Sequence, residues 1–133
     1  MSSFRLRIVT PEGSAFDGEA EAILLPTTEG YVSIRAGHAD YIAVLEIGMV
    51  TVTQNGQERR AACGGGFLNV EHGEAGLVAT TFEYAESIDV ARAQEAKRRA
   101  KELMEAAEDE KQLQSAKAKL FRATNRLRVA GAE

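Results

Sequence analysis

Through residue 84 the hydrophobic pattern of the chain has the two-residue period of β-strands. Phe4, Leu6 and Ile8 alternate with polar residues, and this run stops at a turn signal that begins at Thr10. Similar short apolar runs follow, separated by turns that contain glycine, and Asn55-Gly56 is the strongest hairpin signal among them. The pattern predicts strands within residues 4–8, 19–26, 31–34, 49–53, 59–63, 67–70 and 76–82. Many short strands of this kind are typical of a β-sandwich or barrel.

After Tyr84 the period becomes helical. Apolar residues recur at alternating spacings of three and four, first from Ala93 to Ala107 and again from Leu113 to Ala130. The charged segment 108–111 interrupts this stripe. The pattern therefore predicts two helices joined by a short polar link as an antiparallel hairpin.

These two periods define the predicted architecture. We predict an α+β chain with an N-terminal antiparallel β-sandwich over residues 1–84, followed by a C-terminal antiparallel two-helix hairpin over residues 85–133. Ser87 is the expected N-cap of the first helix, and Asp89 is favourable in its first turn. The predicted seam is rich in alanine, so it buries little apolar area per turn. Two interpretations remain open: a moving element, or an accessory hairpin that stays docked.

Charge is distributed unevenly along the chain. The 133 residues carry 16 Lys and Arg against 20 Asp and Glu, a net charge of −4. Residues 1–86 contribute five basic and twelve acidic groups, whereas residues 87–133 contribute eleven basic and eight acidic ones, so the balances are −7 and +3. Because the first lysine is Lys97, the first 96 residues cannot supply a lysine-dependent phosphate loop or Schiff base. Electrostatic binding of nucleic acid by the acidic part is also disfavoured.

Most catalytic and targeting patterns are missing from the sequence. There is no P-loop, and residues 64–66 do not continue into a dinucleotide-binding fingerprint. His38 and His72 lack a neighbouring ligand pattern, and a single cysteine, Cys63, excludes an internal disulfide. There is no signal-peptide pattern and no apolar run long enough to span a membrane. We expect no catalytic residue and no metal site, in a soluble protein of a reducing compartment.

Four arginines on the two predicted helices share the spacing of side chains on one helical face. Two are seven residues apart on the first helix, and two are four residues apart on the second. An antiparallel hairpin would bring both pairs together, and converging guanidiniums suit phosphate oxygens. The alternative is that they are solvated charges in ordinary ion pairs. These arginines are Arg92, Arg99, Arg122 and Arg126, with the carboxylates of Asp89 and Glu83 expected nearby.

Several short motifs, taken in their order along the chain, resemble one family. They are the segment 8–13 (IVTPEG), Gly37-His38-Ala39, the run 64–70 (GGGFLNV) and the start of the predicted hairpin. Together they are similar to the epsilon subunit of bacterial ATP synthase. The resemblance implies a two-sheet sandwich followed by two helices, in a rotor subunit that is not itself an enzyme. It also implies that the segment from Glu29 and Gly30 to His38 contacts the gamma subunit and the ring of c subunits.

The segment 88–93 (IDVARA) resembles the family motif [I/L]-D-x-x-R-A, which binds ATP in some bacterial members. The second helix supplies the other half in the segment 122–127 (RATNRL). This resemblance implies ATP as a regulatory ligand, not a substrate, with no metal required by the sequence. The implied ATP contacts are Glu83, Ile88, Asp89, Arg92, Ala93, Arg99, Arg122 and Arg126.

The resemblance further implies a switch. In the compact state the hairpin packs on the sandwich and ATP bridges its helices; in the extended state the helices run along gamma and reach the catalytic beta and alpha subunits. The extended state would inhibit ATP hydrolysis by a proton-translocating enzyme, at the cytoplasmic face of the bacterial cell membrane. A purely structural coupling subunit without ATP binding remains the alternative. A nucleic-acid-binding hairpin is disfavoured because acidic residues interrupt its basic ones.

Overall fold

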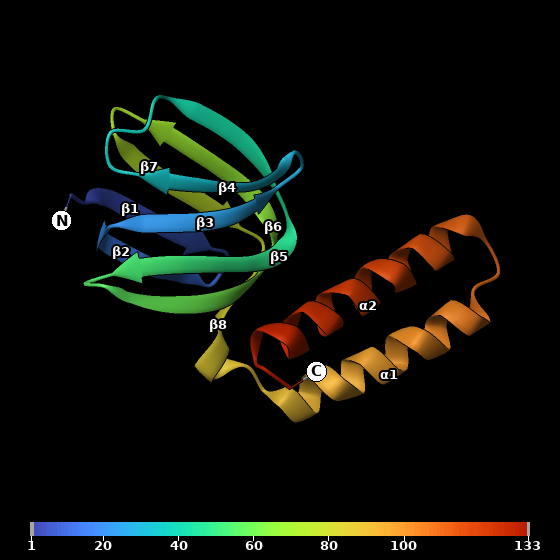
Figure 1. The fold of residues 1–133 in the computed structure, drawn as a ribbon. Coiled ribbons are helices and arrows are strands. Elements are labelled where there is room, and N and C mark those ends of the chain that lie inside the picture. The colour runs from blue at the N-terminus through green and yellow to red at the C-terminus, as the bar shows by residue number, and fades with distance from the viewer. Residues whose placement is uncertain (1, 133) are drawn as a thin grey trace. The chain divides into compact units, whose positions relative to one another are not determined.

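The computed structural model describes residues 2–132 and divides after Tyr84 into two compact units (Figure 1). The first unit consists of strands and the second consists mainly of two helices. The strands are β1 (Phe4–Thr10), β2 (Gly13–Ala20), β3 (Ala22–Thr27), β4 (Gly30–Arg35), β5 (Tyr41–Gln54), β6 (Gln57–Glu71), β7 (Glu74–Ala79) and β8 (Phe82–Tyr84). After the 3-10 turn Ala85–Ser87, the helices are α1 (Val90–Ala106) and α2 (Glu110–Val129).

Two long strands organise the first unit. β5 and β6 pair antiparallel from Tyr41 opposite Val70 to Gln54 opposite Gln57, around the predicted Asn-Gly turn. The strand order is β2-β1-β7-β6-β5-β3-β4, and β8 also pairs with β6. β7 pairs with the last six residues of β6, from Gly66 to Glu71, whereas β3 pairs mainly with the end of β5. The long ribbon is thus shared by both layers of the β-sandwich.

The core of this sandwich is filled by large aliphatic side chains. Leu6, Ile8, Ile23, Leu25 and Leu68 have no measurable exposure. They alternate with outward-facing residues along their strands, as the two-residue period requires. Burial raises the pKa of the Cys63 thiol, which donates to the Gly65 carbonyl oxygen. Cys63 is therefore a small core residue held in its neutral form.

The glycine run 64–66 lies inside β6 at a crowded point. A Cβ on Gly66, whose φ is +145°, would lie 2.0 Å from the Val78 carbonyl oxygen. A Cβ on Gly64 would lie 2.1 Å from the Thr81 hydroxyl oxygen. These glycines permit neighbouring chain segments to approach closely, which explains the motif without any phosphate-binding role.

Several strand predictions need correction. The ranges 59–63 and 67–70 belong to one strand, β6, because it stays paired with β5 through most of the glycine run. β2 was not predicted, since its polar and glycine-rich sequence has no apolar alternation. Pro26 does not end its strand; it lies within β3, where the ladder to β5 shifts register and requires no proline N–H. The pairing of β1 with β7 is parallel, an exception in an otherwise antiparallel sheet.

The second unit is an antiparallel hairpin whose helices are separated by a short link, as predicted. Both helices begin at an aspartate N-cap: the Asp89 side chain accepts from the Arg92 N–H, and Asp109 accepts from the Gln112 N–H. Ser87 is therefore not the N-cap as expected; it ends the preceding 3-10 turn. α2 ends at Val129, and Gly131, the second residue after it, has a φ of +76°. Neither helix in residues 2–132 is long and apolar enough to cross a membrane.

Candidate functional site

A groove runs along one face of the helical hairpin. Its floor is formed by small residues of the helix seam, including Ala100 and Ala123, which are 1% and 2% exposed. Because alanine has no side chain beyond Cβ, the helices approach closely there and longer side chains rise on either side. The groove encloses a cavity of about 650 Å³. Its lining residues are Arg92, Glu95, Ala96, Arg99, Ala100, Leu103, Lys119, Arg122, Ala123 and Arg126.

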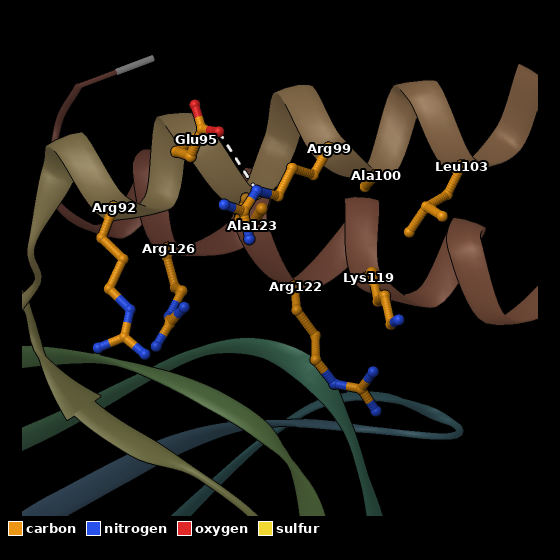
Figure 2. A pocket seen from close by; sticks show the side chains of 10 residues that line it. Arg92, Glu95, Arg99, Ala100, Leu103, Lys119, Arg122, Ala123 and Arg126 are labelled. Carbon is orange, nitrogen blue, oxygen red and sulfur yellow. Dashed lines mark hydrogen bonds and ion pairs between the residues drawn. The ribbon is translucent and has the colours of Figure 1, made fainter.

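Helical spacing places the charged side chains at this cavity. On α1, Arg92, Glu95 and Arg99 follow one another at intervals of three and four residues, so they share a face. Lys119, Arg122 and Arg126 repeat this spacing on α2. All four arginines that the sequence predicted to converge therefore meet at one cavity (Figure 2).

The cavity has a large excess of positive charge. Five cationic side chains line it, against the single carboxylate of Glu95. Within residues 2–132, the side chains of Arg92, Lys119 and Arg122 form no hydrogen bond or ion pair. Such a group of cations lowers its mutual repulsion by binding an anion, and guanidiniums do so with paired, charge-assisted hydrogen bonds. The arrangement is suited to a polyanion such as a phosphate chain.

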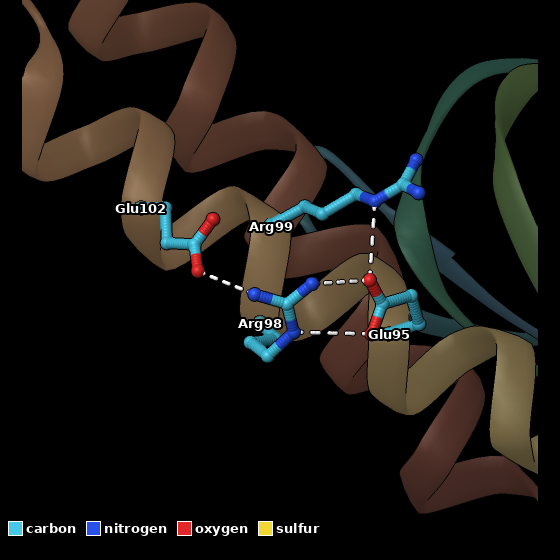
Figure 3. Close-up of polar contacts among 4 residues, drawn as sticks. All are labelled: Glu95, Arg98, Arg99 and Glu102. Atoms are coloured by element: carbon cyan, nitrogen blue, oxygen red, sulfur yellow. Dashed lines mark hydrogen bonds and ion pairs between the residues drawn. The ribbon is translucent and has the colours of Figure 1, made fainter.

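Glu95 is tied into a network along α1 (Figure 3). Its carboxylate accepts from Nε of Arg98 at 3.0 Å and from Nε of Arg99 at 3.2 Å, and Arg98 also contacts Glu102. Hydrogen bonding from Arg98, the largest effect, lowers the pKa of Glu95, and the charges of both arginines add to it. Because Arg99 is held through Nε, its two terminal amino groups remain directed away from Glu95.

The other predicted ATP contacts have different environments. Asp89 caps α1 through its interaction with the Arg92 N–H at 3.0 Å. Ile88 precedes this cap and is 9% exposed, whereas Ala93 is 1% exposed. Glu83 lies in the first unit, on β8 opposite Ala62 of β6. The hairpin alone thus carries seven of the eight predicted residues, and five of those seven are charged.

The three predicted subunit contacts do not form one cluster. Glu29 and Gly30 lie at the turn between β3 and β4, where the Thr27 hydroxyl oxygen accepts from the Glu29 N–H. His38 lies beyond the other end of β4, where Nδ1 donates to the Ala39 carbonyl oxygen at 2.7 Å. The segment from Glu29 to His38 contains the edge strand β4, which includes the strand predicted within residues 31–34, and the six residues of this strand separate the two ends of the segment.

Sequence reasoning missed two features. Lys119 and Glu95 line the cavity, and their three-residue spacing from Arg122 and Arg92 was a usable signal. An exposed apolar row on the sandwich was also missed: Phe67 lies opposite Val44 on one side and Val78 on the other. With Ile42, two residues before Val44, these side chains are 47–77% exposed. We call this set the outer apolar row; a contiguous apolar patch of this kind is typical of a protein interface.

The fold and the cavity together define a class: a two-part protein in which a β-sandwich is followed by an antiparallel helical hairpin with a polycationic groove. No group of three or more side chains within residues 2–132 is arranged to hold a metal ion. Residues 3–85 match the family model of the ATP synthase delta/epsilon chain, beta-sandwich domain. Residues 86–131 match that of the ATP synthase delta/epsilon chain, long alpha-helix domain.

Relatives of similar length agree with these matches. The ATP synthase epsilon chain of Bacillus velezensis is 38% identical over 131 residues, covering 98% of this chain and 99% of the relative. That of Staphylococcus saprophyticus is 40% identical over 131 residues, with 98% of each chain covered. The chain belongs to the ATP synthase delta/epsilon family. It is accordingly an epsilon-type, non-catalytic accessory subunit of an ATP synthase.

A solved structure supports the fold over most of the chain. A chain of the Euglena gracilis mitochondrial ATP synthase, in an assembly of OSCP, F1 and c-ring, aligns with a TM-score of 0.82 at 20% identity. The alignment covers 94% of this chain and 79% of the other. At this identity the likeness establishes the shared architecture and nothing finer.

Proposed function

We propose that this subunit belongs to the rotor's central stalk, couples gamma to the c ring, and regulates ATP hydrolysis through an ATP-binding hairpin. The observation that carries this proposal is the cavity of about 650 Å³, to which both helices contribute arginines. A ligand held by Arg92 and Arg99 from α1 and by Arg122 and Arg126 from α2 stabilises the paired helices. A state in which the helices are separated gains much less from the ligand, because it cannot offer both pairs of arginines at once. ATP therefore favours the compact state of the switch.

The packing of the hairpin makes such control energetically reasonable. The buried seam residues are mostly alanines, namely Ala93, Ala100, Ala116 and Ala123. They bury little apolar area, so only a modest free energy holds the helices together. A ligand at about 100 times its dissociation constant adds roughly 2.7 kcal/mol to the state that binds it. This shifts a balanced two-state equilibrium about a hundredfold.

When ATP is scarce, the helices separate in this proposal and extend along gamma into the catalytic head. Their surplus of basic side chains, eleven against eight acidic ones in residues 87–133, then faces the catalytic beta and alpha subunits. Occupation of the head by these helices blocks rotation in the direction of ATP hydrolysis. The nucleotide acts as an effector throughout, and the subunit performs no reaction on it.

The sandwich supplies the coupling surfaces. The outer apolar row is the surface of the sandwich best suited to bury against gamma, because exposed aliphatic and aromatic side chains gain most from leaving water. The polar turn at Glu29 and Gly30, and the region of His38, are the proposed contacts with gamma and the c ring. Those contacts hold the subunit at the cytoplasmic face of the cell membrane.

Isothermal titration of the purified protein with ATP tests the ligand. The wild type is expected to bind, and Arg126→Ala is expected to weaken binding about tenfold or more, since it removes a charged hydrogen-bond donor. Arg128→Ala is the matched control, because Arg128 lies on the same helix outside the cavity. Absence of binding to the wild type at millimolar ATP would refute the ligand proposal.

Removal of the hairpin tests the regulation separately. Deletion of residues 87–133 is expected to raise the ATP hydrolysis rate of the reconstituted complex, because the inhibitory helices are gone. An unchanged rate would favour the alternative, a purely structural coupling subunit. The sandwich carries its own core and would remain to join gamma to the ring.

A further inference from the structure

Lys119 occupies one end of the cavity in the helical hairpin. It precedes Arg122 by three residues and Arg126 by seven on α2, which at 1.5 Å per residue corresponds to about 4.5 Å and 10.5 Å along the helix axis. The helices are antiparallel, so Arg126 lies towards the start of α1 while Lys119 lies near Leu103 (Figure 2). The cavity therefore has a capped end near Arg92 and a far end near Lys119.

The two ends differ in charge. The Asp89 carboxylate caps α1 one turn before the cavity begins on that helix, so the Arg92 end has mixed charge. At the far end, residues 115, 116, 122 and 123, three or four positions from Lys119, include no carboxylate. The one acidic lining residue, Glu95, is held by Arg98 and Arg99. The positive charge is thus least neutralised around Arg122 and Lys119.

This difference orients a nucleotide in the groove. A carboxylate accepts hydrogen bonds from amino and hydroxyl groups and repels phosphate, so the base and ribose belong at the Arg92 end. The phosphate chain then extends along α2, past Arg126 and Arg122. Its last phosphate, which carries the most negative charge, is the part that reaches Lys119.

Space is available beyond Lys119. A second cavity, of about 340 Å³, shares Leu103 and Lys119 with the first and continues towards Lys111. A third phosphate at Lys119 is therefore not confined by the end of the hairpin. The flexible stem of lysine and its three ammonium donors let it follow a phosphate that the rigid guanidiniums do not reach.

We propose that Lys119 is a specificity-determining residue that contacts the terminal phosphate of a nucleoside triphosphate and lets the site distinguish tri- from diphosphates. The inference rests on the proposed ATP-binding function and assigns a residue outside the predicted set of contacts. It makes the switch respond to the ratio of ATP to ADP and not only to the total nucleotide.

Paired titrations with ATP and ADP, in magnesium-free buffer at low ionic strength, test this proposal. Lys119→Gln is expected to weaken ATP binding about fivefold and ADP binding less than about twofold, since only ATP presents the third phosphate. Lys119→Arg, which keeps the charge, is expected to retain most of the preference. Lys117→Gln is the matched control: it removes the same charge from an exposed position of α2 outside both cavities.

The outcomes separate the two proposals. If the wild type binds ATP and Lys119→Gln keeps the wild-type ratio of ATP to ADP affinity, the specificity role is wrong while the ATP site stands. Equal losses for both nucleotides would also overturn it, because they indicate a general electrostatic effect. If the wild type binds no ATP, both proposals fail. Circular dichroism of each variant verifies that the helices are intact.

Discussion

Leucine, isoleucine and valine fill the core of the sandwich, whereas alanine fills most of the seam between the two helices. Fully buried side chains such as Leu6, Ile23 and Leu77 each contribute about 1.5–3 kcal/mol relative to exposure. Ala100 and Ala123 are equally inaccessible but have far less area to bury. The sandwich therefore buries much more apolar area per core residue than the hairpin buries in its seam, so a bound ligand would add proportionally more to the stability of the hairpin.

Charge follows the same division. The first 86 residues have a balance of −7, and the remaining 47 a balance of +3. In the hairpin, five basic side chains and a single carboxylate line one groove, whereas a cavity on the sandwich is lined by two carboxylates, Glu21 and Glu58, and one arginine, Arg35. In the proposed function, an anion such as ATP therefore acts on the hairpin and not on the sandwich.

The largest expected effect is in the sandwich core. Leu68→Ala should destabilise the first unit by about 3 kcal/mol, because it opens a cavity at a fully buried position. Tyrosine fluorescence reports this unit alone, since all three tyrosines lie within residues 1–84, and circular dichroism at 222 nm reports mainly the helices. Urea denaturation should shift the fluorescence midpoint far more than the helical one.

Phe67→Ala is the matched control for this measurement. Phe67 is adjacent in sequence but 60% exposed, so its removal should cost much less stability. If Leu68→Ala moves both spectroscopic transitions equally, the two units unfold together. The comparison between a self-sufficient sandwich and a dependent hairpin would then be wrong.

The second prediction concerns the ligand. ATP at about 100 times its dissociation constant should stabilise the helical transition by roughly 2.7 kcal/mol while the tyrosine transition stays in place. Arg122→Ala should remove most of this stabilisation, since it deletes a cation of the cavity. A shift of the tyrosine transition alone would show that ATP binds the sandwich and not the hairpin, and would contradict the proposed site.

Much of the fold could be predicted because the hydrophobic period changes near Tyr84. The spacing of the alanines and leucines also gave the helical hairpin. The continuity of β6 could not be predicted, because three consecutive glycines are typical of a loop. Only the close packing of β6 against Val78 and Thr81 explains why glycines are needed within this strand. Nor could the sequence show that Leu68 faces inward and Phe67 outward, because both are apolar.

The candidate site was predictable to a similar extent. Helical spacing alone brought the four arginines together, since α-helix geometry fixes which side chains share a face. The same rule places Lys119 and Glu95 at the cavity, although neither belongs to the arginine pattern from which the site was predicted. Helical spacing gives no information about Glu83, because Glu83 lies on β8 and not on either helix.

The third prediction separates two functions of Asp89. Its carboxylate caps α1, and it is also a proposed ATP contact. Asp89→Ala should destabilise the helical transition by about 1 kcal/mol, whereas Asp89→Asn should leave it nearly unchanged because asparagine is an equally good N-cap. ATP titration of the stable Asp89→Asn variant then reports the binding role alone. Equal helix stability in both variants would contradict the capping role.

The smallest expected effect is the pH dependence of the hairpin through Glu95. Arg98 lowers the pKa of this carboxyl in the folded helix. The carboxylate therefore stabilises α1 at pH values above its unfolded pKa of about 4.3, and the contribution is lost as the pH falls through the lower folded pKa. Between about pH 6 and pH 3, Glu95→Gln should lose slightly less helix stability than the wild type, as measured by urea denaturation followed by circular dichroism at 222 nm.

Glu105→Gln is the control for this prediction. Glu105 lies on the same helix and has no ion pair among the described residues, so this variant should behave as the wild type. If it matches Glu95→Gln instead, the acid sensitivity comes from net charge and not from the Glu95 network.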